Sequence, residues 1–284
     1  MMIGIICALS LAAGVGLCQM TGAFESFWWL LWMPVGFFGG FILCLILAFL
    51  ILLLVCKCID PDAVFEEDSP WFRWMILSYI RTILTILPVR IETRGTEKVP
   101  RDGRFLLVCN HLHNIDPGIV LNSLPRKLQV SFVAKREARD MFLLQNVLPR
   151  LMCPYINREN DREALKTILR CISLLKQDKL SIGIFPEGRI NKYRKLAHFR
   201  PGVFKIAQKA NVPVVVCTLQ NTQDVLANVK KLKSSFVKFH VLDVIPVEQL
   251  QGVTTVEIAD RVYKMMAEDL GPENVLTPEE EENA

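Results

Sequence analysis

The first 56 residues of this 284-residue chain contain no lysine or arginine, and Glu25 is their only acidic residue. Within this segment, residues 27–56 form a run that is almost wholly apolar and carries no charge. A helix needs about 20 such residues to cross the hydrocarbon core of a bilayer. The run therefore predicts a transmembrane helix, so a water-soluble domain has to be built from the residues that follow.

The two ends of this run differ in a way that predicts its orientation. Trp28, Trp29 and Trp32 cluster at its start, where an aromatic belt would meet the membrane surface, and Lys57 follows its end directly. Basic residues flank only the C-terminal end, which is therefore expected to be cytoplasmic. Residues 1–19 are a second apolar run that lacks the basic start of a signal peptide. We expect a helical hairpin with both ends in the cytosol. A single span is the alternative, because the first run is near the lower length limit.

The part of the chain after the apolar segment is basic. All 33 lysines and arginines lie between Lys57 and Pro272, whereas six of the 29 acidic residues lie outside that stretch, which leaves it a net charge of about +10. Such a charge suits an anionic membrane surface or a phosphate-bearing substrate. No finger spacing of Cys and His, and no RNA-binding aromatic motif, favours nucleic acid. The nine cysteines are scattered without a Cys-x-x-Cys pair, which predicts reduced thiols.

One polar string stands out after an apolar run. Residues 105–109 predict a short buried strand, and Asn110-His111-Leu112-His113-Asn114-Ile115-Asp116-Pro117 follows them. A histidine thus lies at the end of a strand, and a carboxylate lies five residues later at the start of a predicted helix. Such a turn can bring the imidazole and the carboxylate together, which the same spacing on one regular helix would not easily do. A histidine held by a carboxylate is a candidate general base for a hydroxyl.

Three more blocks follow in order: Tyr155-Ile156-Asn157-Arg158, Phe185-Pro186-Glu187-Gly188-Arg189 and Val212-Pro213-Val214. Together with Asn110 to Asp116, this ordered set resembles the glycerolipid acyltransferase family, whose best-known members acylate lysophosphatidic acid. The resemblance covers about residues 70–250. It implies transfer of a fatty acyl group from acyl-CoA or acyl-carrier protein to the sn-2 hydroxyl of lysophosphatidic acid, with no metal or organic cofactor besides the donor.

Short apolar runs alternate with helical patterns after Pro88. We expect strands at residues 89–93, 105–109, 130–134, 155–156, 182–185, 212–217 and 236–244, and helices at 117–122, 137–147, 162–175, 202–209 and 256–270. This alternation predicts an α/β layered domain with a largely parallel central sheet. The expected organisation is a membrane anchor (1–57), a linker with an interfacial or packing helix (58–88), an acyltransferase domain (89–271) and an acidic mobile tail (272–284).

The resemblance assigns roles to individual residues. His111 would take the proton from the lysolipid hydroxyl, and Asp116 would orient the imidazole. The residues assigned to the acceptor's phosphate are Arg158, Glu187, Gly188, Arg189 and Lys135. The family's motif has a threonine between the glycine and the arginine, which this chain lacks, so Arg189 is shifted by one residue. Lys192 or Arg194 could replace it.

Each assignment has a simpler alternative. Asp116 before Pro117 is also an ordinary helix start, in which the aspartate caps the helix. His111-x-His113 is similar to zinc hydrolases, although a metal site needs at least three well-placed ligands and the chain has four histidines in all. At the level of function, the alternatives are an acyltransferase for another lysophospholipid head group and a non-catalytic, membrane-anchored lipid-binding protein.

Overall fold

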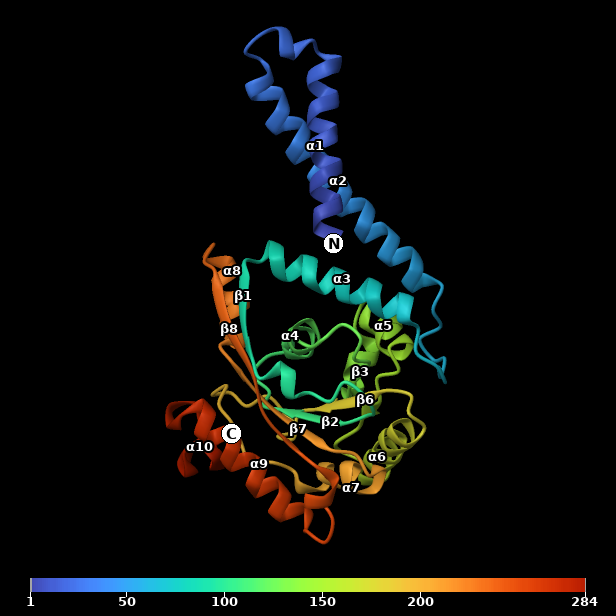
Figure 1. The fold of residues 1–284 in the computed structure, drawn as a ribbon, viewed down its shortest axis with the longest axis vertical. Coiled ribbons are helices and arrows are strands. Elements are labelled where there is room, and N and C mark those ends of the chain that lie inside the picture. The colour runs from blue at the N-terminus through green and yellow to red at the C-terminus, as the bar shows by residue number, and fades with distance from the viewer. Residues whose placement is uncertain (1, 284) are drawn as a thin grey trace. The chain divides into compact units, whose positions relative to one another are not determined.

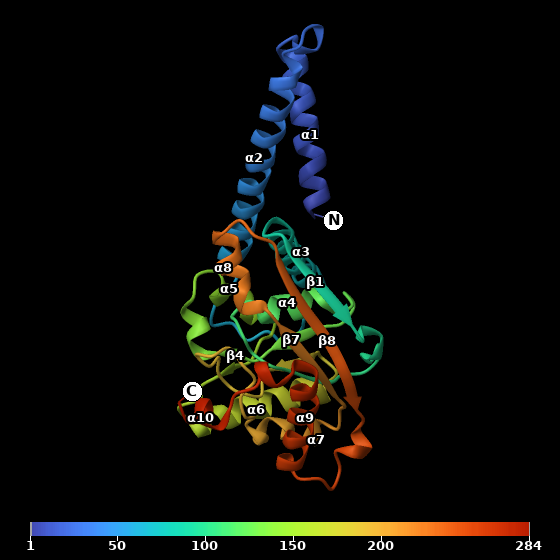
Figure 2. The same cartoon turned by 90° about the vertical axis from the view of Figure 1, so that its left-hand side faces the viewer.

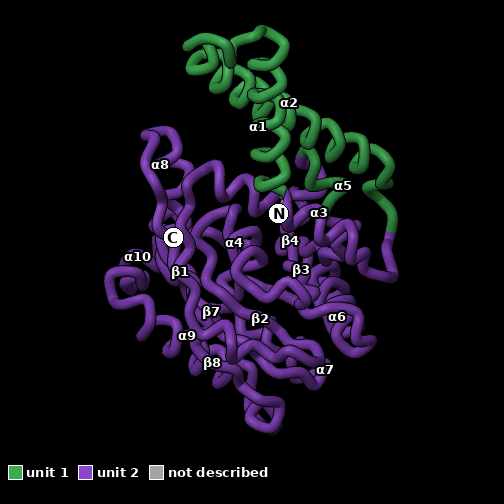
Figure 3. The backbone as a smooth tube through the Cα atoms, turned by 45° about the horizontal axis from the view of Figure 1, so that its top comes forward, with its two compact units in different colours: residues 1–63, 142–147 green, residues 64–141, 148–284 purple. Residues whose placement is uncertain are grey.

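The computed structural model describes residues 2–283, and the chain divides into two compact units. The first consists of the residues up to Ala63 together with Phe142–Val147, and the second consists of Val64–Met141 and the residues from Leu148 onward (Figure 3).

The first unit is built on a hairpin of two apolar helices, α1 (Met2–Met20) and α2 (Trp29–Lys57). Both are long and apolar enough to cross a membrane. Small residues line the contact between them. A Cβ atom built on Gly36 would lie 2.7 Å from the Cα of Gly14, and one built on Gly40 would lie 2.9 Å from the Cβ of Ala13. Close backbone approach at small residues is the way helices associate in lipid, where burying apolar surface gives no advantage.

The second unit contains a six-stranded sheet in the order β1-β8-β7-β2-β6-β3 (Figure 1). Its strands are β1 (Val89–Arg94), β2 (Leu106–Cys109), β3 (Val130–Phe132), β6 (Ser181–Ile184), β7 (Val214–Gln220) and β8 (Ser235–Ile245). All neighbouring strands are parallel except β7 and β8, which are antiparallel. The predicted α/β domain with a largely parallel sheet is thus confirmed.

Helices cover both faces of this sheet (Figures 1 and 2). The helices on one face are α3 (Pro70–Ile86) and α4 (Asp116–Ser123); those on the other are α6 (Asp161–Lys176), α7 (Lys205–Ala210) and α9 (Thr255–Leu270). Alternate residues of β2 point to opposite faces: Leu107 packs with Ile119 of α4, whereas Leu106 packs in the cluster that contains Val262 of α9. A strand buried on both faces must be apolar throughout, which is why residues 105–109 are recognisable in the sequence.

The structure differs from the sequence-based prediction in several local features. The helix expected at 137–147 is a 3-10 turn, Arg136–Asp140, followed by the short helix α5 (Leu144–Arg150). Leu143 between them has a φ of 65°, a conformation that no continuous helix contains. The strand at 155–156 belongs to a separate two-stranded sheet, in which β5 (Tyr155–Ile156) pairs with β4 (Ala134–Lys135). The helix α8 (Val225–Lys230) was not expected.

The acidic tail, for which the sequence predicts mobility, makes contacts with the domain in the structure. It contains the short helix α10 (Pro278–Glu282), which begins with a capping box at Thr277. Val275 forms a parallel β-bridge with Leu196, and Glu280 pairs with Lys195 at 2.8 Å. The tail's negative charge therefore meets the positive charge of the segment that follows β6, a long-range match that composition alone does not reveal.

Candidate active site

The turn between β2 and α4 is organised around one carboxylate oxygen. Asp116 Oδ2 accepts hydrogen bonds from the main-chain N–H groups of Leu112 and His113, at 2.7 and 2.8 Å, and lies 2.8 Å from His111 Nδ1. Asp116 is fully buried and is the first residue of α4, after the N-cap residue Ile115. Its side chain is therefore turned back onto the loop, in place of the helix cap that the sequence also allowed.

This arrangement fixes which nitrogen of His111 is available for chemistry. Because Asp116 can only accept a hydrogen bond, the neutral imidazole carries its proton on Nδ1 and its lone pair on Nε2. The His111 side chain is 14% exposed, so the ring is sheltered but reachable. An imidazole held this way by a buried carboxylate can accept a proton at Nε2, and the carboxylate then stabilises the resulting charge.

Two aromatic rings support the histidine. The Phe185 ring stacks on the His111 imidazole with centroids 4.0 Å apart and planes 10° apart, and Phe132 stacks behind Phe185 at 5.0 Å. Phe132 and Phe185 come from β3 and from the residue just after β6. The imidazole plane is therefore fixed by packing as well as by its bond to Asp116.

Asn110 fixes the strand end from which this turn departs. Its Oδ1 accepts from the Leu219 N–H at 2.7 Å, and its Nδ2 donates to the Leu219 carbonyl at 2.9 Å. Asn110 is fully buried and joins the ends of β2 and β7, which are neighbours in the sheet. Asn110 thus provides hydrogen-bond partners for the N–H and the carbonyl of Leu219, where the two strands separate.

Glu187 was expected at the acceptor's phosphate, and the structure gives it another position. It is 4% exposed, and its oxygens accept main-chain hydrogen bonds from His111 at 2.7 Å and Ala197 at 3.1 Å. Burial raises the pKa of Glu187 to about 8, against the lowering effect of these two hydrogen bonds. The side chain therefore joins the His111 turn to the segment that leads to Arg200, and does not project into solvent.

Gly188 lies where a side chain would collide with an arginine. Its φ is 80°, and a Cβ atom built on it would lie 2.9 Å from Arg200 Nε. The main-chain N–H of Arg200 also donates to the Pro186 carbonyl at 2.9 Å. Arg158 belongs to the same group, since burial and the nearby positive charge of Arg200 lower its pKa. The structure thus places Arg200 against Gly188, with Arg158 near enough for the charge of Arg200 to act on it.

Arg200 was missed in the sequence because it lies outside every block of the resemblance. The only local signal is that it directly precedes Pro201, in a string that is otherwise unremarkable. Its position results from folding of the segment after β6 back onto the Pro186–Gly188 turn.

The remaining basic candidates lie elsewhere. Arg189 is exposed, and Lys135 is exposed and paired with Glu137 at 2.9 Å. Arg194 donates to the Leu112 carbonyl at 2.9 Å, so it stabilises the turn that carries His111. Lys192 lies over the Tyr193 ring. Of these four, Lys135 alone is linked to Arg158, and indirectly, because its partner Glu137 lies near enough to act on the charge of Arg158.

A second histidine–carboxylate pair occurs in the same unit. His240 Nδ1 lies 3.2 Å from Asp269 Oδ1, and the Thr218 hydroxyl donates to Asp269 Oδ2 at 2.5 Å. The pair joins β7, β8 and α9. Its His240 Nε2 is buried and has no hydrogen-bond partner among the described residues, which suits a packing role better than catalysis.

Comparison with known proteins agrees with this geometry. Residues 90–220 match the family model described as Acyltransferase. A probable 1-acyl-sn-glycerol-3-phosphate acyltransferase of Mycoplasma pneumoniae is 26% identical over 203 residues, which cover 69% of this chain and 75% of that protein. The 1-acyl-sn-glycerol-3-phosphate acyltransferase of Borreliella burgdorferi is 25% identical over 198 residues, covering 68% and 78%.

A human relative and a solved structure extend the likeness. The 1-acyl-sn-glycerol-3-phosphate acyltransferase alpha of Homo sapiens is 26% identical over 206 residues, covering 70% of this chain and 69% of that protein. The crystal structure of the 1-acyl-sn-glycerophosphate acyltransferase PlsC from Thermotoga maritima shares the fold, with a TM-score of 0.57 and 20% identity over 78% of this chain and 86% of that chain. Residues 90–220 of this chain thus form a domain that matches the Acyltransferase family model.

Proposed function

We propose that this protein is a membrane-bound enzyme that transfers a fatty acyl group from a thioester donor to the sn-2 hydroxyl of lysophosphatidic acid, giving phosphatidic acid. The observation that carries the proposal is the His111–Asp116 pair, tied through Glu187 and the turn after β6 to the Gly188–Arg158–Arg200 group. The relatives named above supply the acceptor class. The donor is acyl-CoA or acyl-carrier protein, with no other cofactor.

The proposed reaction needs one proton carrier. His111 Nε2 takes the proton of the lysolipid hydroxyl as the oxygen attacks the thioester carbonyl carbon. The tetrahedral intermediate then expels the thiolate, the carbon–sulfur bond breaks, and the imidazolium returns its proton to the sulfur. Asp116 stabilises the imidazolium while it exists. The acceptor's own hydroxyl is the nucleophile, so no acyl-enzyme forms.

We place the acceptor's phosphate at Arg158 and Arg200. Guanidinium groups bind phosphate through pairs of parallel hydrogen bonds, and Gly188 leaves room for the Arg200 side chain. The two apolar helices would hold the enzyme in the bilayer that contains its acceptor and product. The basic residues that follow α2 favour a cytoplasmic position for the catalytic unit.

A second candidate is an acyltransferase for a lysophospholipid with a larger head group. The observation that favours it is the exposed, shifted Arg189, which leaves the phosphate site without the residue that the family's motif supplies there. The two candidates differ in their acceptor and share their catalytic pair.

The test compares membranes that contain the wild type, His111→Ala or His240→Asn. Each receives labelled acyl-CoA or acyl-carrier protein and a panel of lysolipids, and the lipid products are separated. We expect phosphatidic acid from the wild type and from His240→Asn, and a rate about 10²–10⁴-fold lower from His111→Ala. A different acylated lipid would establish the second candidate. Equal product from all three proteins would exclude His111 as the base, and bound lysolipid without product would favour a non-catalytic lipid-binding protein.

A further inference from the structure

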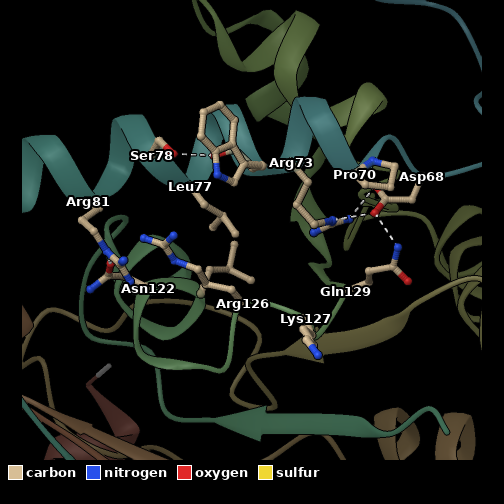
Figure 4. Close-up of a pocket in the computed structure, with 12 residues that line it drawn as sticks. Asp68, Pro70, Arg73, Leu77, Ser78, Arg81, Asn122, Arg126, Lys127 and Gln129 are labelled. Carbon is tan, nitrogen blue, oxygen red and sulfur yellow. Dashed lines mark hydrogen bonds and ion pairs between the residues drawn. The ribbon is translucent and has the colours of Figure 1, made fainter. Parts of the chain in front are cut away.

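A cavity of about 230 Å³ lies between α3, α4 and the loop after α4 (Figure 4). Its residues are Asp68, Pro70, Arg73, Trp74, Leu77, Ser78, Arg81, Leu121, Asn122, Arg126, Lys127 and Gln129. None of them belongs to the candidate active site. Asp116 begins α4 and Asn122 lies near its end, about 9 Å away along the helix axis at 1.5 Å per residue.

The two ends of the cavity differ in charge. Arg73 pairs with Asp68 through Nε at 2.8 Å and NH2 at 3.0 Å, and Gln129 donates to the same carboxylate at 3.1 Å. That end is neutral and its hydrogen bonds are satisfied. Figure 4 shows Arg81, Asn122 and Arg126 together at the other end, without an acidic neighbour among the residues drawn.

At the basic end of the cavity, a neutral side chain holds Arg81 in place, and no described carboxylate does so. Arg81 Nε donates to Asn122 Oδ1 at 3.1 Å, and this is the only described hydrogen bond of its guanidinium group. Burial and the positive charge of Arg126 lower the pKa of Arg81. Across residues 2–283, no ion pair between a carboxylate and Arg81, Arg126 or Lys127 is described. Two guanidinium groups thus lie together at one end of a cavity whose lining also includes Lys127, an arrangement that an anion would stabilise.

We propose that this cavity binds a phosphate group, carried either by the head group of an anionic phospholipid or by a free phosphate. Arg81 and Arg126 would each donate to its oxygens, and Lys127 would add a third positive charge. The cavity wall also includes Trp74, which is 42% exposed and lies near the exposed Trp71 on α3. Aromatic side chains next to basic ones are typical of a surface that meets lipid head groups.

The experiment uses the purified full chain in a non-ionic detergent and follows the melting temperature, Tm, as ligand is added. The ligands are phosphatidylglycerol, phosphatidylcholine and inorganic phosphate, none of which is the acceptor or product of the proposed reaction. The variants are Arg126→Gln and, as a matched control, Arg261→Gln. Both arginines are exposed, Arg261 lies on α9 at the other face of the sheet, and both changes remove one charge.

Phosphatidylglycerol is expected to raise the Tm of the wild type and of Arg261→Gln, because a ligand that binds only the folded state stabilises it. Arg126→Gln should need a lipid concentration at least about tenfold higher for the same increase in Tm, as expected for the loss of a charged hydrogen bond. The same pattern with inorganic phosphate would identify a soluble phosphate as the ligand. Equal responses of Arg126→Gln and Arg261→Gln, or equal effects of phosphatidylglycerol and phosphatidylcholine, would overturn the proposal. The measurement does not depend on turnover, so its result tests the phosphate site independently of the proposed reaction.

Discussion

The main-chain N–H of His111 donates to Glu187 Oε1 at 2.7 Å, so a side chain from the turn after β6 holds a residue near the start of the turn after β2. The strands β2 and β6 are parallel neighbours, and their carboxyl ends meet at one edge of the sheet. Two blocks that are 76 residues apart in the chain are thereby joined through a single hydrogen bond. Glu187 positions the proposed base without touching the reacting atoms.

Replacing Asp116 with asparagine tests whether the negative charge of Asp116 or only its hydrogen bonds in the turn are needed for catalysis. One Asp116 oxygen accepts all three described hydrogen bonds, so the asparagine carbonyl can keep them while the negative charge is lost. We expect kcat to fall by about 10²–10⁴-fold, because the imidazolium loses its partner, and KM for the lysolipid to stay the same. Steady-state kinetics over a range of lysolipid concentrations measure both constants. An unchanged kcat would show that Asp116 only shapes the turn.

Arg200→Gln and Arg189→Gln test the placement of the acceptor's phosphate. Arg200 lies against Gly188 beside Arg158, whereas Arg189 is exposed and outside that group. We expect KM for lysophosphatidic acid to rise about tenfold in Arg200→Gln, since a charged hydrogen bond contributes about 1.5–3 kcal/mol, and to change little in Arg189→Gln. The reverse order of effects would place the phosphate at Arg189.

Gly188→Ala is expected to destabilise the protein and displace Arg200. The φ of 80° costs a residue with a Cβ atom about 1–3 kcal/mol, and the methyl group would meet Arg200 Nε at 2.9 Å. Thermal unfolding of Gly188→Ala should therefore occur at a lower temperature, with a higher KM. Gly202→Ala is the control, because a Cβ atom there would have no neighbour within 4 Å. Equal Tm values for both variants would contradict this account.

Glu187→Gln is expected to change how stability depends on pH. The carboxyl group titrates near its ordinary pKa of 4.5 when unfolded and at about 8 when buried in the fold. Between these values the folded state binds the extra proton, so the contribution of Glu187 to stability is complete below about 4.5 and is lost as pH rises to 8. Tm measured from pH 5 to pH 8 should thus fall more in the wild type than in Glu187→Gln. Parallel curves would show that Glu187 is ionised in the folded protein throughout this range.

The central strands could be predicted because both faces of the sheet are covered. A strand such as β2 must then be apolar at every position, and such a run is visible without knowledge of its neighbours. The direction of β8 relative to β7 has no such local signature, since it depends on how the connection through α8 returns to the sheet. For the same reason, the pairing of β5 with β4 outside the main sheet could not be foreseen.

In the candidate site too, features with a local sequence signature could be predicted, whereas features that depend on distant segments could not. The five-residue spacing of His111 and Asp116 predicted their contact, since a tight turn between a strand and a helix leaves few other arrangements. Arg200 could not be predicted, because its position depends on the segment after β6 folding back through main-chain hydrogen bonds. The position of Glu187 was not predicted either, because its partners are backbone groups, which every residue type offers alike.

That last feature bears on which substitutions the site tolerates. Glu187 binds the N–H groups of His111 and Ala197, and any residue except proline supplies such a group. As far as this contact is concerned, position 197 can vary freely among the other residue types, whereas position 187 requires a side chain with two accepting oxygens at the right reach. One glutamate thus holds two segments together while placing almost no demand on the residue types that it binds.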